Sequence, residues 1–120
     1  MRRFAYAFAL ACAVFGAGLA YAARQDFTLV NRTGYQIDSV YVSKSSSNSW
    51  EEDVMGRDTL NDGESVDISF EKGERGCRYD LMVKYHDGDQ SYWTNLDLCS
   101  ISKVQLFWDR RAGQTRAVTD

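Results

Sequence analysis

Short runs in which apolar and polar residues alternate make up most of the chain from residue 25 onward, and turn-forming residues separate them. Alternation with a period of two is typical of strands that bury one face. The runs cover residues 25–31, 35–44, 58–60, 64–70, 78–85, 90–98 and 102–109. They predict an all-β fold, a small antiparallel β-sandwich of six or seven strands, with a small barrel as the alternative.

The most distinct hairpin lies between Cys77 and Cys99. Its two runs are rich in Tyr, Trp, Val and Leu, and the Asp87-Gly88 pair between them favours a tight turn. A three-residue turn centred on Gly88 would place Cys77 directly opposite Cys99, so a disulfide would close the open end. Closing a loop of roughly 20 residues in this way adds about 3 kcal/mol of stability.

Two changes of parity along the predicted strands indicate β-bulges. In the second strand of this hairpin, Trp93 shares the register of the buried face, whereas Leu96 and Leu98 have the opposite parity. An extra residue between Thr94 and Leu98 would turn all three inward. The run 35–44 changes parity in the same way, which suggests either a bulge near residues 38–39 or a strand covered on both faces.

The run 25–31 is followed by the turn 32–34, in which Asn31 and Gly34 suit a tight hairpin into the run 35–44. Asn31 also begins an Asn-Arg-Thr glycosylation sequon. Because this tripeptide is common by chance, we favour the turn interpretation.

Residues 1–22 have the pattern of a signal peptide. Arg2 and Arg3 precede an apolar run, and Ala20-Tyr21-Ala22 fits the cleavage rule, so we expect cleavage after Ala22. A retained membrane anchor or lipidation of Cys12 is the alternative, but the run is shorter than the about 20 residues that a span needs. We therefore expect a periplasmic or secreted protein without a membrane span.

The rest of the chain divides into a sandwich domain, 23–109, and a tail, 110–120, predicted to be disordered because it lacks an apolar pattern. Two cysteines remain after cleavage, an even number in an oxidising compartment. The 17 acidic residues all remain, whereas 12 of the 14 basic ones do, which leaves a formal charge of −5. This charge argues against nucleic-acid binding. We expect a monomer.

A serine-rich loop begins at Ser43 and leads into one predicted helical turn. Ser49 and Glu52 have the spacing of a capping box, and Gly56 suits the end of the turn. Trp50 would then face the same way as Val54, onto the sheet.

This segment supplies the candidate binding residues, because binding sites tend to lie on loops that a rigid scaffold supports. They are Trp50, Glu51, Glu52, Asp53, Arg57 and Asp58. The sequence accordingly predicts a non-enzymatic binding module for an unknown ligand. The alternative interpretation of Trp50 is a core residue, as aromatic residues in a small sandwich usually are.

Other chemistry is less well supported. The single histidine, His86, lies in a turn, so we predict no catalytic residue, and zinc would need more ligands. The acidic residues around Asp58 and Asp62 suggest a calcium site as a minor alternative, although Leu60 occupies a ligand position. Glycoside hydrolysis by two carboxylates is a further minor alternative. We predict no cofactor. A different alternative is an envelope structural or inhibitor-type protein that binds a protein partner along a sheet edge.

The segments NRTGYQIDSVYVSKSSSNSW and EDVMGRDTL, followed by a Cys-x-Tyr-Asp-Leu strand and a Leu-Cys pair, resemble a family of small exported bacterial proteins of unknown function. The likeness extends from Asp26 to Asp109. Members of this family sometimes carry the name argininosuccinate lyase. The residues do not support that activity, because such a lyase is a large helical tetramer, and the resemblance implies no substrate, cofactor or catalytic residue.

Overall fold

The computed structural model describes residues 23–47 and 49–120. The predicted signal peptide, 1–22, lies outside the described residues. Within them there are seven strands: β1 Phe27–Arg32, β2 Ile37–Lys44, β3 Ser65–Ile68, β4 Arg78–Tyr85, β5 Gln90–Asp97, β6 Lys103–Asp109 and β7 Gln114–Thr119. The all-β prediction is therefore confirmed.

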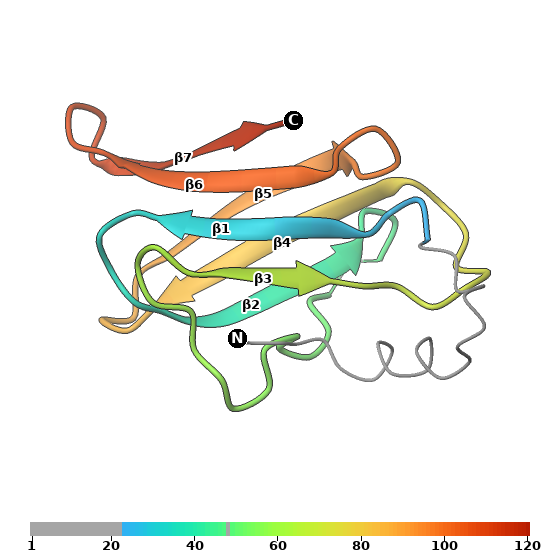
Figure 1. Cartoon of the computed structure of the whole chain (residues 1–120), viewed down its shortest axis with the longest axis horizontal. Helices are drawn as coiled ribbons and strands as arrows, with labels where there is room; N and C mark the ends of the chain where they lie inside the picture. Colours follow the sequence, from blue (N-terminus) through green and yellow to red (C-terminus); the bar gives the residue numbers. More distant parts are fainter. Residues whose placement is uncertain (1–22, 48) are drawn as a thin grey trace.

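The strands form two sheets that face each other (Figure 1). The strand order is β3-β1-β6-β7 in the four-stranded sheet and β2-β4-β5 in the three-stranded sheet. Four of the five strand pairings are antiparallel, and only β1 with β6 is parallel. The architecture is the predicted small β-sandwich.

The core lies between the two sheets and follows the alternation that the sequence shows. Val66 and Ile68 of β3, together with Val104 and Leu106 of β6, are buried as expected. The opposite sheet contributes the fully buried side chains of Val40, Leu81 and Val83. Burying one such side chain stabilises the fold by roughly 1.5–3 kcal/mol.

The turn after β1 does not form the expected hairpin. β1 pairs with β3 and β6, whereas β2 pairs with β4, so residues 33–36 connect one sheet to the other. The reason lies in the Asn31 side chain, which is fully buried and binds this connection. Its burial also removes the sequon from the folded surface.

No helix occurs in the described residues, so the predicted helical turn after Ser49 is wrong. Asp53 instead pairs with Tyr41 of β2 in an isolated bridge. Its Oδ1 accepts hydrogen bonds from the backbone N–H groups of Val40, at 2.8 Å, and Met55, at 3.0 Å. These hydrogen bonds, one to β2 and one to the backbone two residues on, replace the bonds that a helix would make.

The tail predicted to be disordered contains β7, so the domain extends beyond residue 109. β7 pairs antiparallel with β6 from Gln114 to Thr119. Its inward residues are Thr115 and Ala117, which are too small or too polar to produce an apolar pattern. The buried Thr115 hydroxyl is satisfied by a 2.5 Å hydrogen bond to the Tyr85 hydroxyl of the opposite sheet.

Both expected bulges are present. On β5 the register shifts between the pairs Leu81↔Trp93 and Tyr79↔Leu96, so two residues of β5 oppose one of β4. Asn95 takes the extra position with φ of 57°, a left-handed conformation that Asn tolerates better than most residues. The second bulge lies in β2, between Ile37 and Ser39.

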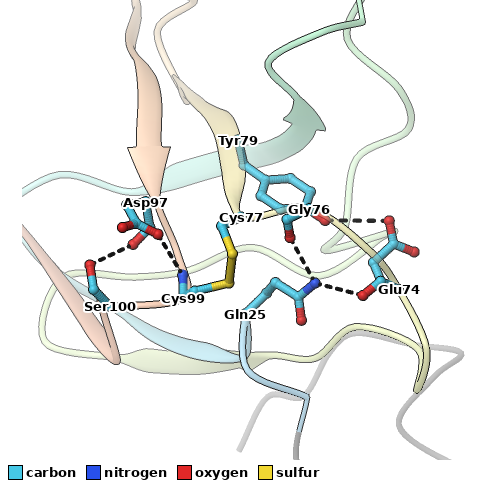
Figure 2. Close-up of a disulfide and its surroundings, with 8 residues drawn as sticks. All are labelled: Gln25, Glu74, Gly76, Cys77, Tyr79, Asp97, Cys99 and Ser100. Atoms are coloured by element: carbon cyan, nitrogen blue, oxygen red, sulfur yellow. Dashed lines mark hydrogen bonds between the residues drawn. A yellow bond between two sulfur atoms is a disulfide. The ribbon is translucent and has the colours of Figure 1, made fainter.

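The Cys77–Cys99 disulfide is present at the open end of the β4–β5 hairpin, with a Cα–Cα distance of 5.2 Å (Figure 2). The two cysteines are not directly opposed, because the turn is centred on Asp87 and not on Gly88. The backbone of Cys77 bonds instead to Leu98, whose N–H donates to the Cys77 carbonyl at 2.8 Å. The β5 bulge reduces the offset between the two cysteines by one residue, so the disulfide still forms.

Next to the bridge, the buried ring of Tyr79 links β4 to the loop before it (Figure 2). The Tyr79 hydroxyl donates to Glu74 Oε2 at 3.3 Å. Burial, together with the negative charge of Glu74, raises the pKa of Tyr79 to about 12.

This shift predicts a loss of stability at alkaline pH. The folded state disfavours the phenolate, so the contribution of neutral Tyr79 is complete below pH 10 and is lost as the pH rises toward about 12. In Tyr79→Phe the melting temperature should fall less steeply over this range than in the wild type, as thermal unfolding at several pH values would show. Burial also raises the pKa of Tyr85, so part of the decline remains. Equal declines in both proteins would contradict the prediction.

Candidate functional site

The serine-rich loop and Trp50 enclose a polar hollow of about 260 Å³ at one end of the three-stranded sheet. It is lined by Ser43, Ser45, Ser47, Ser49, Trp50 and Asp80. Trp50 is half-buried. It is not among the described side chains that pack against the core, whereas Trp93 is. The structure therefore places Trp50 at a surface hollow and not in the core.

Hydrogen bonds between the loop and the sheet position two serines of this hollow, Ser43 and Ser45. The Ser43 hydroxyl accepts from the backbone N–H of Glu51 at 3.1 Å. Ser45 donates its hydroxyl to Asp80 Oδ1 at 2.7 Å, and its backbone N–H to the Arg78 carbonyl at 3.0 Å. Each hydroxyl can both donate and accept, so the serines keep bonding capacity for a ligand.

Asp80 is the one ionisable residue among the described residues that line this hollow. Both of its bonds use the same oxygen, since the backbone N–H of Asn95 in the β5 bulge also donates to Oδ1, at 2.8 Å. Within the part of the chain that the structure describes, Oδ2 has no hydrogen-bond partner. A carboxylate oxygen in this position can accept hydrogen bonds from ligand hydroxyl or amide groups.

Of the candidate binding residues, only Trp50 lines the hollow. Glu51 and Glu52 follow it but are exposed, as are Arg57 and Asp58. Asp53 is occupied by its hydrogen bonds to the backbone. The sequence missed Asp80 because it occupies an ordinary strand position, and only the folded loop brings it beside Trp50.

Within the described part of the chain, the acidic residues considered for calcium do not form a group of ligands. Asp62 accepts a hydrogen bond from the backbone N–H of Gly34 at 2.8 Å. Among the described residues, the one group of three possible ligands within 4.8 Å is Cys77, Asp97 and Cys99. Its two sulfur atoms form the disulfide and so are not thiolate ligands. The structure offers no positive support for a metal site.

His86 lies in the β4–β5 turn and pairs with Asp38 at 3.1 Å, and their side chains are 74% and 36% exposed. The pKa of Asp38 is lowered, chiefly by the hydrogen bond from Gln36 and further by His86. Neither contact brings a nucleophile to the histidine.

A second aromatic feature lies at the other end of β4, where the sequence suggested only strand positions. Tyr35 is 55% exposed, and Trp108, which the alternation in the run 102–109 places on the same face as Val104 and Leu106, is half-buried. Their rings contact each other at a centroid distance of 6.0 Å. The nearby Gly34 was a usable signal, since it indicates that Tyr35 belongs to a connection and not to a strand.

The fold and the bridge define a small disulfide-bonded β-sandwich protein, and the disulfide indicates a compartment other than the cytoplasm. No helix of the described residues is long and apolar enough to span a membrane. No family model and no curated protein matches the sequence.

Among solved structures, the chain is similar to the NMR structure of a protein from Eubacterium rectale. The TM-score is 0.56 at 16% sequence identity, and the match covers 78% of this chain and 85% of that one. A likeness at this identity concerns the fold alone.

Proposed function

We propose that this protein is an exported, non-enzymatic binding module that holds a hydroxyl-rich ligand in the Trp50 hollow. Export would use residues 1–22 as a signal peptide cleaved after Ala22, which would deliver the domain to the periplasm or the medium. The N-terminal sequence pattern and the disulfide both support this location.

The observation that carries the proposal is that Asp80 Oδ2, which has no partner among the described residues, lies in a hollow that also contains Trp50 and four serines. An aromatic side chain offers apolar contact area, while serine hydroxyls and a carboxylate oxygen fix the orientation of polar groups. A sugar or a short peptide presents both kinds of surface. Among the described side chains that line the hollow there is no histidine and no second carboxylate, so the lining favours binding over acid–base chemistry.

Trp50→Ala should weaken ligand binding tenfold or more, because it removes the aromatic contact. A tenfold loss of affinity corresponds to about 1.4 kcal/mol. Its melting temperature should change by only about 3 °C, because Trp50 does not pack against the core. Titration calorimetry with soluble fragments of envelope polysaccharide and peptide, together with thermal unfolding, measures both effects.

Trp93→Ala is the matched control. Its ring packs against the core, so truncation should lower the melting temperature by about 10 °C through lost packing. If Trp50→Ala lost as much stability as Trp93→Ala, Trp50 would be a structural residue and the proposal would fail.

Recognition of a protein partner along a sheet edge has less support. β5 is an edge strand, and Tyr92 on it is 61% exposed. However, the bulge at Asn95 interrupts this edge, and bulges disfavour the addition of a further strand. Pull-down and crosslinking with periplasmic extract would support this alternative only if a stable protein partner were captured.

A further inference from the structure

Three connections meet at the end of the sandwich opposite the disulfide: residues 33–36, 86–89 and 110–113. They join β1 to β2, β4 to β5 and β6 to β7, and all lie at the left in Figure 1. Loops grouped at one end of a β-sandwich are a common position for ligand recognition, because two sheets support them.

Tyr35 forms the centre of this loop end. Its ring makes edge-to-face contacts with Trp108, at a centroid distance of 6.0 Å, and with Tyr85, at 6.4 Å. Although 55% of Tyr35 is exposed, its ring packs against two other aromatic rings. Tyr35 and Trp108 thus form an aromatic ridge on the surface.

Hydrogen bonds to buried and neighbouring side chains also fix the connection that carries Tyr35. Asn31 Nδ2 donates to the Tyr35 carbonyl at 2.8 Å, and the Thr33 hydroxyl donates to Asn31 Oδ1 at 2.7 Å. The backbone N–H of Gly34 donates to Asp62 at 2.8 Å, and Gly34 itself has a φ of 89°. Ordering this loop in the unbound protein reduces the entropy that binding would cost.

A hollow of about 600 Å³ on one side of the aromatic ridge is positively charged. Arg32, Arg110 and Arg116 line it, together with Thr33, Gly34 and Phe107. Arg32 Nε donates to the neutral Gln105 at 2.8 Å, and the Arg116 guanidinium lies 5.0 Å from the centre of the Phe107 ring. Within residues 23–47 and 49–120, none of the three arginines forms an ion pair with a carboxylate. Their charges are therefore available to an anionic ligand.

The hollow on the other side, of about 470 Å³, is acidic. His86, Asp87 and Asp89 line it beside Gln36. A ligand that crosses the aromatic ridge must therefore bring an anion to the arginines and hydrogen-bond donors to the aspartates. An acidic peptide such as polyglutamate would bring carboxylates to this side without hydroxyl groups that could donate to the aspartates, whereas a neutral sugar would leave the arginines unused.

We infer that the aromatic ridge binds an acidic oligosaccharide, a chain of pyranose rings that carries carboxylates. A sugar ring would stack its C–H face on Tyr35, its hydroxyls would donate to Asp89 and Asp87, and a neighbouring carboxylate would pair with Arg110 and Arg116. This site is separate from the Trp50 hollow, which lies at the opposite end of the domain.

Titration calorimetry with hexagalacturonate, maltohexaose and hexaglutamate tests this inference on the protein from residue 23 onward, with its disulfide intact. Hexagalacturonate should bind, and the neutral sugar and the acidic peptide should bind at least tenfold more weakly. Tyr35→Ala should reduce affinity for hexagalacturonate at least tenfold. The matched control is Tyr92→Ala, since Tyr92 is similarly exposed at 61% but lies on β5, away from the aromatic ridge.

The double variant Arg110→Gln with Arg116→Gln should also lose at least tenfold in affinity, and its remaining binding should depend less on salt. Arg75→Gln, an exposed arginine near the disulfide, should bind as the wild type does. Trp50→Ala should leave this binding unchanged, which distinguishes the two sites. The inference is overturned if hexagalacturonate does not bind, if either comparison ligand binds equally well, or if Tyr92→Ala and Arg75→Gln reduce affinity as much as the ridge variants.

Discussion

Replacing both bridge cysteines, as Cys77→Ser with Cys99→Ser, is expected to lower the free energy of unfolding by about 3 kcal/mol. The bridge joins residues 22 positions apart, and without it the unfolded chain gains the entropy of that loop. For a domain of this size the melting temperature should fall by about 15 °C.

Thermal unfolding of the oxidised wild type, the reduced wild type and the double serine variant measures this effect. Reduction should reproduce most of the loss without any substitution, because it removes the same covalent constraint. A reduced wild type that melts at the same temperature as the oxidised protein would show that the bridge contributes nothing to stability.

Asn31→Ala is expected to cost about 3 kcal/mol or more, because its buried amide satisfies all four of its hydrogen-bonding positions. Nδ2 donates to the carbonyls of Tyr35, at 2.8 Å, and Leu60, at 2.9 Å. Oδ1 accepts from the backbone N–H and the hydroxyl of Thr33, at 3.0 and 2.7 Å. Truncation leaves the buried backbone N–H of Thr33 unsatisfied, removes one hydrogen bond each from the Tyr35 and Leu60 carbonyls, and releases the connection between the two sheets.

Chemical denaturation of Asn31→Ala beside Asn61→Ala isolates the effect, since Asn61 is exposed and close in the fold. Asn61→Ala should change the free energy of unfolding by about 0.5 kcal/mol or less. Asn31→Asp should also be destabilised at neutral pH, because a carboxylate oxygen would face two carbonyls. Its stability should recover as the pH falls and the acid becomes protonated. Equal stability of the two alanine variants would contradict this account of Asn31.

The bridged hairpin could be predicted closely, because its inner residues are large and its chemistry is local. The change of parity between Trp93 and Leu96 is sufficient by itself to locate the β5 bulge, since each face of a strand is either buried or solvated. The predicted turn centre was wrong by one residue because Asp87 and Gly88 both suit a tight turn.

Elements whose partners are distant in the sequence could not be predicted. β7 buries Thr115 and Ala117, and only the Tyr85 hydroxyl of the opposite sheet explains a buried threonine there. Asp53 has the residue type of a helix N-terminus, yet its carboxylate bonds to β2, 13 residues away, at Val40. In both cases a tertiary hydrogen bond decided the conformation.

The candidate site was predicted only in part for the same reason. Trp50 could be singled out because it lies between a polar loop and a charged turn. Asp80 reaches it only through the folded loop, while the arginines near Tyr35 come from β1, from the β6–β7 connection and from β7. No local pattern connects residues so far apart in the chain.

The central claim is that a rigid sandwich core presents ligand sites at its loop ends and does not transform what it binds. Amide NMR spectra, recorded while soluble envelope polysaccharide fragments are added, test it most directly. We predict shifts confined to residues that line the Trp50 hollow or the aromatic ridge, with the sugar signals chemically unchanged. Shifts that follow the β5 edge, or new sugar signals that reveal turnover, would contradict the claim.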